Sequence, residues 1–220
     1  MDVTDFTRRN RDLLGRFPRA FLEDVVQALA LVYTETFDGT SELPLANARY
    51  LRPHQLRTFA EMAFLRIARR HGVNASTGYN RNGDAHNLVA SPPYVGTLSR
   101  LQHPRALPRR AAFRWMYANY VSMAQFPMPG MIEREAPIQI DERRTPAYII
   151  FGHGSQVPHA REVGFIVVNF MGRDGRYLGA PIDLMREFRA VTAPVSQEIV
   201  DDSLAVRPRS LPRVRNAGQK

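Results

Sequence analysis

A group of arginines interleaved with aromatic residues in the middle of the sequence is the strongest candidate for chemistry. Its members are Arg100, Arg105, Arg109, Arg110 and Arg114, followed by Trp115, Tyr117 and Tyr120. No acidic residue lies between Asp84 and Glu133 to neutralise them. A guanidinium group binds phosphate through two parallel hydrogen bonds and stacks on bases, and aromatic side chains offer further stacking surfaces. We therefore expect this segment to bind nucleic acid; the alternative interpretation is a solvated helix face whose aromatic residues belong to the core.

Two other groups of arginines extend this expectation. One, at the end of a predicted helix, consists of Arg66, Arg69 and Arg70, and the other, in the last sixteen residues, consists of Arg207, Arg209, Arg213 and Arg215. Unstructured arginine arms bind a nucleic-acid backbone by releasing counterions, without reading its sequence. The alternative for the terminal group is a solubilising tail that binds nothing.

Two histidines and a serine form the candidate catalytic group. His153 and His159 enclose the segment GSQVP between two predicted strands, with Ser155 between them. Imidazoles at a turn could act as acid and base. A catalytic metal site needs a third ligand, and Glu162 is the nearest carboxylate. We predict no metal and no cofactor, and we keep catalysis at these residues as an alternative.

The string YIIFGHGS, residues 148–155, resembles the strand that carries His-Gly-Ser or His-Gly-Thr in the histidine–tyrosine–glutamate ADP-ribosyltransferases. This resemblance implies that His153 and Ser155 are ligands of the nicotinamide ribose and that Tyr177 stacks on the nicotinamide. It implies Glu187 or Glu198 as the catalytic acid. The resemblance covers only these few residues, and the intervals to Tyr177 and to the glutamates are shorter than that fold normally has.

Composition excludes several classes of site. The chain of 220 residues has a formal charge of +9, and all its basic residues except Lys220 are arginines. The absence of cysteine excludes disulfides, zinc fingers, iron–sulfur clusters and thiol nucleophiles. The absence of an internal lysine excludes a Walker A loop and a pyridoxal Schiff base. No apolar run approaches the ~20 residues that span a bilayer, so we expect no membrane partner and a location in the cytoplasm, or inside a virion if the protein is viral.

Charge is unevenly distributed along the chain. Residues 1–70 sum to +2, 71–130 to +5, 131–204 to −3 and 205–220 to +5. A genome rich in G and C would favour arginine over lysine, but it would not decide where the arginines fall. The positions of the two most basic segments therefore carry the functional information.

The first third of the sequence is typical of helices. Apolar residues recur at helical spacing after Pro18, and Asp38-Gly39 should end that helix. A polar loop should follow, and Pro53 should open a second helix over 54–71, with Gly72 as its stop. A third helix is expected from 108 to about 125. We predict a loop over 73–96, or a strand near 87–90 within it, because turn-forming residues dominate there.

The remainder indicates strands. Segments 145–151 and 163–171 are rich in β-branched and aromatic residues, and 137–140 is a candidate edge strand. Asp174-Gly175 predicts a tight hairpin to 177–182. Asp183 is expected to cap a short helix through Phe188. Residues 197–200 show the last apolar pattern, and 205–220 should be a disordered tail.

These observations predict an α+β fold with three main helices, then a small, mostly antiparallel sheet with a short helix. Residues 1–130 would form a basic helical part and 131–204 a β-rich part packed on it, in one compact domain, with 205–220 as the tail. The leading hypothesis is a nucleic-acid-binding protein, structural or regulatory, such as a coat or nucleoprotein subunit, and homo-oligomers are among the expected partners. The alternatives are an enzyme acting on a nucleotide or nucleic acid, or an assembly subunit that binds an acidic protein.

Overall fold

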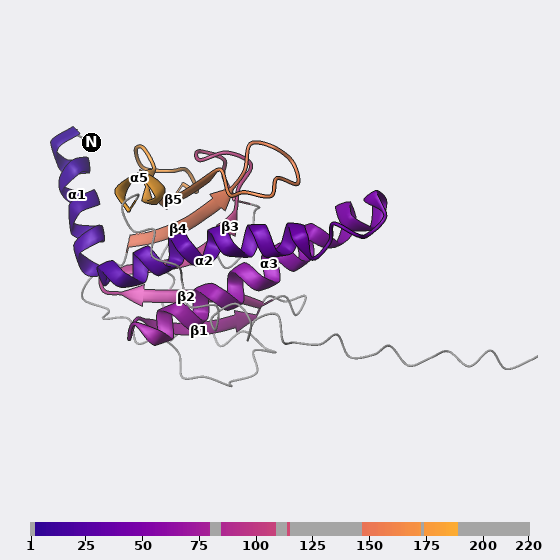
Figure 1. Cartoon of the computed structure of the whole chain (residues 1–220). Coiled ribbons are helices and arrows are strands. Elements are labelled where there is room, and N and C mark those ends of the chain that lie inside the picture. Colours follow the sequence, from indigo (N-terminus) through magenta and orange to yellow (C-terminus); the bar gives the residue numbers. More distant parts are fainter. Residues whose placement is uncertain (1–2, 80–84, 109–113, 115–146, 173, 189–220) are drawn as a thin grey trace, which may run out of the picture.

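The structure, a computed structural model, describes residues 3–79, 85–108, 114, 147–172 and 174–188. Three helices come first in the chain, followed by a six-stranded sheet and a short helix. Figure 1 shows two of the helices, α2 and α3, lying together across one face of the sheet, with their connection extending beyond its edge. The predicted α+β class is confirmed.

The helices are α1 (Val3–Arg16), α2 (Arg19–Asp38) and α3 (Leu45–Arg70). Helix α2 confirms the prediction from apolar spacing, and its buried residues include Phe21, Val25 and Leu29. Helix α1 was not predicted, because polar and charged residues dominate its sequence and leave only a short apolar side around Leu13 and Leu14.

Helix α3 begins eight residues before the predicted start at Pro53. Pro44 precedes its first residue, and Pro53 lies inside the helix. A proline there removes one backbone hydrogen bond, which is why the sequence suggested a boundary. The helix ends as predicted: Gly72 follows it with φ of 66°, a left-handed conformation that glycine adopts without a steric penalty.

The sheet contains β1 (Asn74–Tyr79), β2 (Ala85–Ser91), β3 (Tyr94–Arg100), β4 (Ala147–Gly154), β5 (Phe165–Phe170) and β6 (Ile182–Asp183), in that spatial order. Neighbouring strands are antiparallel except β3 and β4, which are parallel. A parallel pair needs a crossover connection, and residues 101–146 supply it. Its first part returns over the sheet face opposite the helices, where Leu101 packs on Phe165 and Val167.

The predicted loop over 73–96 is wrong, and the alternative strand near 87–90 is confirmed as part of β2. Strands β1 and β2 and the first part of β3 occupy this region. Polar side chains obscured them because these side chains are satisfied across the sheet: Thr77 donates a hydrogen bond to the Asn87 carbonyl oxygen Oδ1 at 2.9 Å. Gly78 leaves room for the buried His86 ring, since a Cβ at residue 78 would lie 2.7 Å from the imidazole Nε2.

The β-rich half agrees better with prediction. Strands β4 and β5 occupy the two expected segments, and Asp183 caps the short helix α5 (Leu184–Glu187), its Oδ1 accepting the Arg186 N–H at 3.1 Å. The chain reverses near Gly175, but Met171 and Tyr177 pair across five residues rather than a two-residue turn. The predictions for 137–140, 197–200 and 205–220, and all of helix 108–125 except Pro108 and Arg114, lie outside the described residues.

The main core lies between α2, α3 and the sheet. Phe17, Phe21, Phe64 and Phe151 form one aromatic cluster, with ring centroids 5.0–6.1 Å apart. All four are almost completely buried. This cluster joins the helices to the middle of β4 and fixes where the ends of α2 and α3 lie relative to the strands.

Candidate functional site

A narrow pocket lies where the α2–α3 hairpin meets the loop between β4 and β5 (residues 155–164). We call it the hairpin pocket. It is lined by Tyr33, Thr36, Phe37, Arg52, Pro53, Leu56, Arg100, Ser155, Val157, His159 and Ala160. Three of these residues, Arg100, Ser155 and His159, were candidate site residues in the sequence.

The two helices supply one wall of the hairpin pocket. Tyr33, Thr36 and Phe37 occupy one side of the last turns of α2, because residues three and four apart share a helix face. Arg52 comes from the early part of α3, and its Nε donates a hydrogen bond to the Thr40 hydroxyl. Its guanidinium carbon lies 4.2 Å from the centre of the Phe37 ring. These two contacts fix the position of a positive charge at the pocket.

Strand β3 supplies the second positive charge. Arg100 is the last residue of β3 and is paired in register with His153 of β4. Its guanidinium is exposed and lies close enough to the Tyr33 hydroxyl to lower the pKa of that group, although burial outweighs this effect and raises the pKa of Tyr33 to about 12. Tyr33 therefore stays neutral and acts as a hydrogen-bonding group.

A buried hydroxyl faces the same space. Thr36 is 4% exposed and lines the hairpin pocket, and its Oγ1 has no hydrogen-bond partner among the described residues. Leaving a buried hydroxyl unpaired costs on the order of 1–3 kcal/mol. An unsatisfied group at a pocket wall is therefore the feature that most needs a functional explanation.

His153 lies beneath the pocket and does not line it. Its Nδ1 is 3.1 Å from the Tyr33 hydroxyl, and the two rings meet edge to face. Burial, with a smaller contribution from Arg100, lowers the pKa of His153 to about 3. His153 is therefore neutral, and its Nδ1 shares one hydrogen bond with the Tyr33 hydroxyl, whose donor is set by the tautomer of the imidazole.

The glycines beside His153 have a packing role. A Cβ on Gly154 would collide with the Leu101 carbonyl oxygen, and one on Gly152 would lie 2.5 Å from the Leu101 side chain. Both glycines therefore let residue 101 cross the strand. The sequence Gly-His-Gly therefore reflects two features of β4: close packing of Leu101 on one face and a buried histidine on the other.

The other residues implied by the ADP-ribosyltransferase resemblance are not brought together. His153 lies on the helix-covered face, whereas Tyr177 lies on the opposite face, its hydroxyl donating to the Ala106 carbonyl at 2.9 Å. Ser155 accepts the Val157 N–H at 3.2 Å and starts the β4–β5 loop. Glu187 lies in α5, and Glu198 is outside the described residues.

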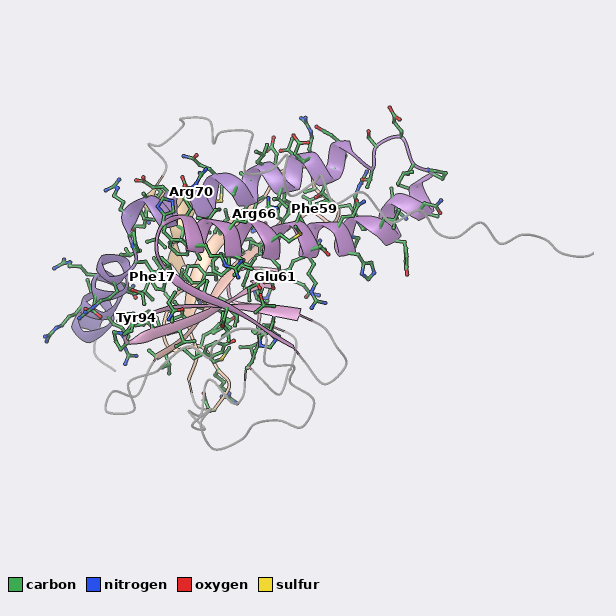
Figure 2. All side chains as sticks on the ribbon, turned by 90° about the horizontal axis from the view of Figure 1, so that it is seen from below. Phe17, Phe59, Glu61, Arg66, Arg70 and Tyr94 are labelled. Atoms are coloured by element: carbon green, nitrogen blue, oxygen red, sulfur yellow. The ribbon has the colours of Figure 1, made fainter. Side chains whose placement is uncertain are left out.

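A second polar cluster joins α3 to β2. The backbone N–H of Asn87 donates to Glu61 Oε2 at 3.3 Å, and its side-chain amide donates to the Glu61 carbonyl at 2.7 Å. Burial raises the pKa of Glu61 to about 7, against the opposing effects of the Asn87 N–H and of the Arg57 and Arg114 charges. Figure 2 shows Glu61 on the side of α3 that faces the strands.

Arg114 belongs to this cluster. Its Nη2 donates to the Ser99 hydroxyl at 3.0 Å, and burial lowers its pKa. The neighbouring His86 is also buried, and this burial, together with the charges of Arg114 and Arg57, lowers its pKa to about 4. Arg114 is therefore held by the protein itself and is partly buried, whereas Arg100 and Arg105 are exposed.

The remaining predicted site residues divide into two sets. Arg69 and Arg70 are exposed at the end of α3, and Arg66 is partly buried one turn earlier. The others lie outside the described residues: Arg109, Arg110, Trp115, Tyr117, Arg207, Arg209, Arg213 and Arg215.

Sequence reasoning did not find Arg52, Thr36 or Tyr33. Arg52 was assigned to a loop because Pro53 suggested a helix start. Thr36 and Tyr33 lie within an apolar helix, where the pattern gives no reason to single them out. The available signal was their spacing of three residues, which places a phenol and a hydroxyl on one side of the helix.

No protein-family model, curated protein or solved structure matches this chain. Among the described residues, no helix is long and apolar enough to cross a membrane. The same residues contain no group of three or more histidines and carboxylates placed to hold a metal ion.

Proposed function

We propose that this protein binds nucleic acid through contacts between arginines and backbone phosphates, with little sequence specificity. The observation that carries the proposal is the charge of α3. This helix contains six arginines, Arg49, Arg52, Arg57, Arg66, Arg69 and Arg70, and a single carboxylate, Glu61.

That carboxylate does little to neutralise the outer surface of the helix. Glu61 faces β2, where it accepts the Asn87 N–H, and its pKa of about 7 means that it is partly protonated near neutral pH. Its own residues therefore make α3 strongly basic, which supports the proposal of a phosphate-binding surface.

The end of α3 is the most basic part. Figure 2 labels Arg66 and Arg70 along its last turns, and Arg69 and Arg70 are exposed. Cations at a helix C-terminus also stabilise the helix, so their position alone does not indicate a ligand. The excess of arginine continues through the whole helix and to Arg100 and Arg105, which the helix dipole does not explain.

A structural or packaging role fits this surface better than catalysis does. Phosphate contacts position a protein on nucleic acid and give affinity without reading bases. Such a surface suits a nucleoprotein or coat subunit, whose task is to cover nucleic acid irrespective of sequence.

The test is fluorescence anisotropy with labelled single-stranded RNA, single-stranded DNA and duplex DNA of mixed sequence. The double variant Arg69→Gln/Arg70→Gln should bind roughly tenfold more weakly on all probes, since two phosphate contacts are lost. The matched control is Arg176→Gln/Arg186→Gln, which removes two exposed arginines from the β-rich part. Equal losses in the two variants would show a net-charge effect and contradict a binding surface on α3.

A further inference from the structure

We propose that the hairpin pocket binds a terminal phosphate, the phosphate monoester at a nucleic-acid strand end or on a mononucleotide. The strand-end form of this inference rests on the proposed function, whereas the mononucleotide form does not. Three independent features of the pocket support the ligand class: its charge, its unsatisfied hydroxyl and its size.

The hairpin pocket is positively charged. Arg52 and Arg100 line it, and among the residues that the structure describes no carboxylate lines it. Asp38, at the end of α2, lies nearby in sequence but is held in a bidentate ion pair by Arg161, at 2.9 and 2.8 Å. Two guanidiniums without a local acid favour a dianion, the charge state of a phosphate monoester near neutral pH.

The Thr36 hydroxyl indicates a polar ligand. Other helical threonines donate to the carbonyl four residues earlier: Thr34 to Ala30 at 3.4 Å, Thr40 to Thr36 at 2.9 Å and Thr58 to His54 at 3.0 Å. Thr36 does not make this bond, and its Oγ1 has no other partner among the described residues. A phosphate oxygen in the pocket would accept a hydrogen bond from the Thr36 hydroxyl and so give this group a partner.

The size of the hairpin pocket limits what enters. It is narrow and partly open to solvent, which suits a small group better than a base or a sugar. A phosphate within a continuous strand carries a nucleoside on both sides, whereas a terminal phosphate presents three oxygens free of substituents. The proposed ligand is therefore a chain end.

The loop that closes the hairpin pocket is held in an unusual conformation. His159 has φ of 58°, in the left-handed region, which costs a residue other than glycine roughly 1 kcal/mol. The Asp38–Arg161 ion pair and the hydrogen bond from Gly164 N–H to the Gly154 carbonyl, 2.8 Å, hold the loop against α2. This arrangement keeps Ser155 and His159 at the pocket mouth, where both could donate to the phosphate.

The experiment compares the affinity of a 5′-phosphorylated oligonucleotide with that of the same oligonucleotide carrying a 5′-hydroxyl. The ratio of these two affinities measures the terminal phosphate alone, because contacts along the strand cancel. Wild type should prefer the phosphorylated strand by about tenfold, or about 1.4 kcal/mol. Arg100→Gln and Thr36→Val should reduce the ratio toward one.

The control is Arg105→Gln, which removes an exposed arginine that does not line the pocket. It should weaken both oligonucleotides equally and leave the ratio unchanged. Adenosine monophosphate and inorganic phosphate are titrated in parallel, with binding followed by thermal shift, to distinguish a strand end from a free phosphate.

The outcomes separate the two proposals. A ratio near one in wild type, with no pocket-dependent binding of adenosine monophosphate, would overturn this inference and leave nucleic-acid binding standing. If no oligonucleotide binds but adenosine monophosphate binds in an Arg100- and Thr36-dependent way, the pocket stands and the proposed function fails. Binding of inorganic phosphate alone, unaffected by either variant, would also overturn the inference.

Discussion

Asp38 at the end of α2 and Arg161 in the β4–β5 loop form a bidentate ion pair, with Nε–Oδ1 at 2.9 Å and Nη2–Oδ2 at 2.8 Å. The pair joins the helical hairpin to the loop at the mouth of the hairpin pocket. It also holds a carboxylate at the end of α2 in an ion pair, so that this group competes less with an anionic ligand.

Arg161→Gln should loosen the loop without unfolding the protein, because an exposed ion pair contributes little to global stability. Hydrogen exchange of amides 155–164 should accelerate while the melting temperature stays nearly unchanged.

The hydrogen bond to Arg161 is the main cause of the lowered pKa of Asp38, so Arg161→Gln should return that pKa toward 3.8. Because the folded-state pKa is lowered, the contribution of the pair is present above pH 3.8 and is lost as the pH falls through the folded value. Unchanged exchange in the loop would contradict this account.

Thr36→Val should stabilise the unliganded protein by about 1 kcal/mol, because it removes a buried hydroxyl that has no partner there. Thr97→Val is the contrasting control. The Thr97 hydroxyl is hydrogen-bonded to that of Tyr148 at 2.7 Å, so this change removes a buried hydrogen bond and should destabilise the protein. Denaturant midpoints of the three proteins measure both effects. A loss of stability in Thr36→Val similar to that in Thr97→Val would show that Thr36 has a structural partner.

The titration of Glu61 should lower the free energy of unfolding as the pH rises from 5 to 8. Its folded-state pKa of about 7 exceeds the ordinary value of 4.5, so the folded state binds more protons in that range. The difference in free energy of unfolding between wild type and Glu61→Gln should change by about 2 kcal/mol over this range. Denaturation of both proteins at a series of pH values gives this difference, from which the other titrating groups cancel. Parallel curves would mean that Glu61 titrates normally.

The titration of His153 should have the opposite effect and lower the free energy of unfolding as the pH falls. Its folded-state pKa of about 3 lies below the ordinary 6.5, so its contribution to stability is present above pH 6.5 and is lost as the pH falls. Relative to His153→Gln, wild type should lose about 2 kcal/mol between pH 7 and pH 5. The nitrogen chemical shifts of His153 should show a neutral imidazole throughout this range. A ring protonated on both nitrogens at pH 5 would contradict the lowered pKa.

The sequence predicted those elements whose local signals agree with their environment. Helix α2 shows apolar spacing, β4 and β5 are strongly apolar, and Asp183 is a favourable N-cap before a short helix. Strands β1 and β2 lacked such a signal. Asn87 and His86 are buried and Thr77 is partly buried. Their burial depends on pairing between the two strands, on the space above Gly78 and on the contact of Asn87 with Glu61 of α3.

The candidate site was only partly predictable for the same reason. Ser155 and His159 attracted attention as polar residues between two strands, and both line the pocket. Arg52 and Thr36 acquire their roles only when the hairpin folds against the β4–β5 loop. The buried position of His153 depends on Tyr33, which is 120 residues earlier in the chain. Local sequence patterns do not indicate contacts between residues so far apart in the chain.

The most direct test of phosphate binding by arginines is the salt dependence of affinity for a mixed-sequence single strand. We predict that the logarithm of the association constant falls linearly with the logarithm of salt concentration, with a slope of about −3 or steeper, as expected for four or more phosphate contacts at about −0.7 each. Arg69→Gln/Arg70→Gln should reduce the magnitude of that slope by about 1.4. The absence of binding at about 50 mM salt, or a slope near zero, would contradict the proposed function.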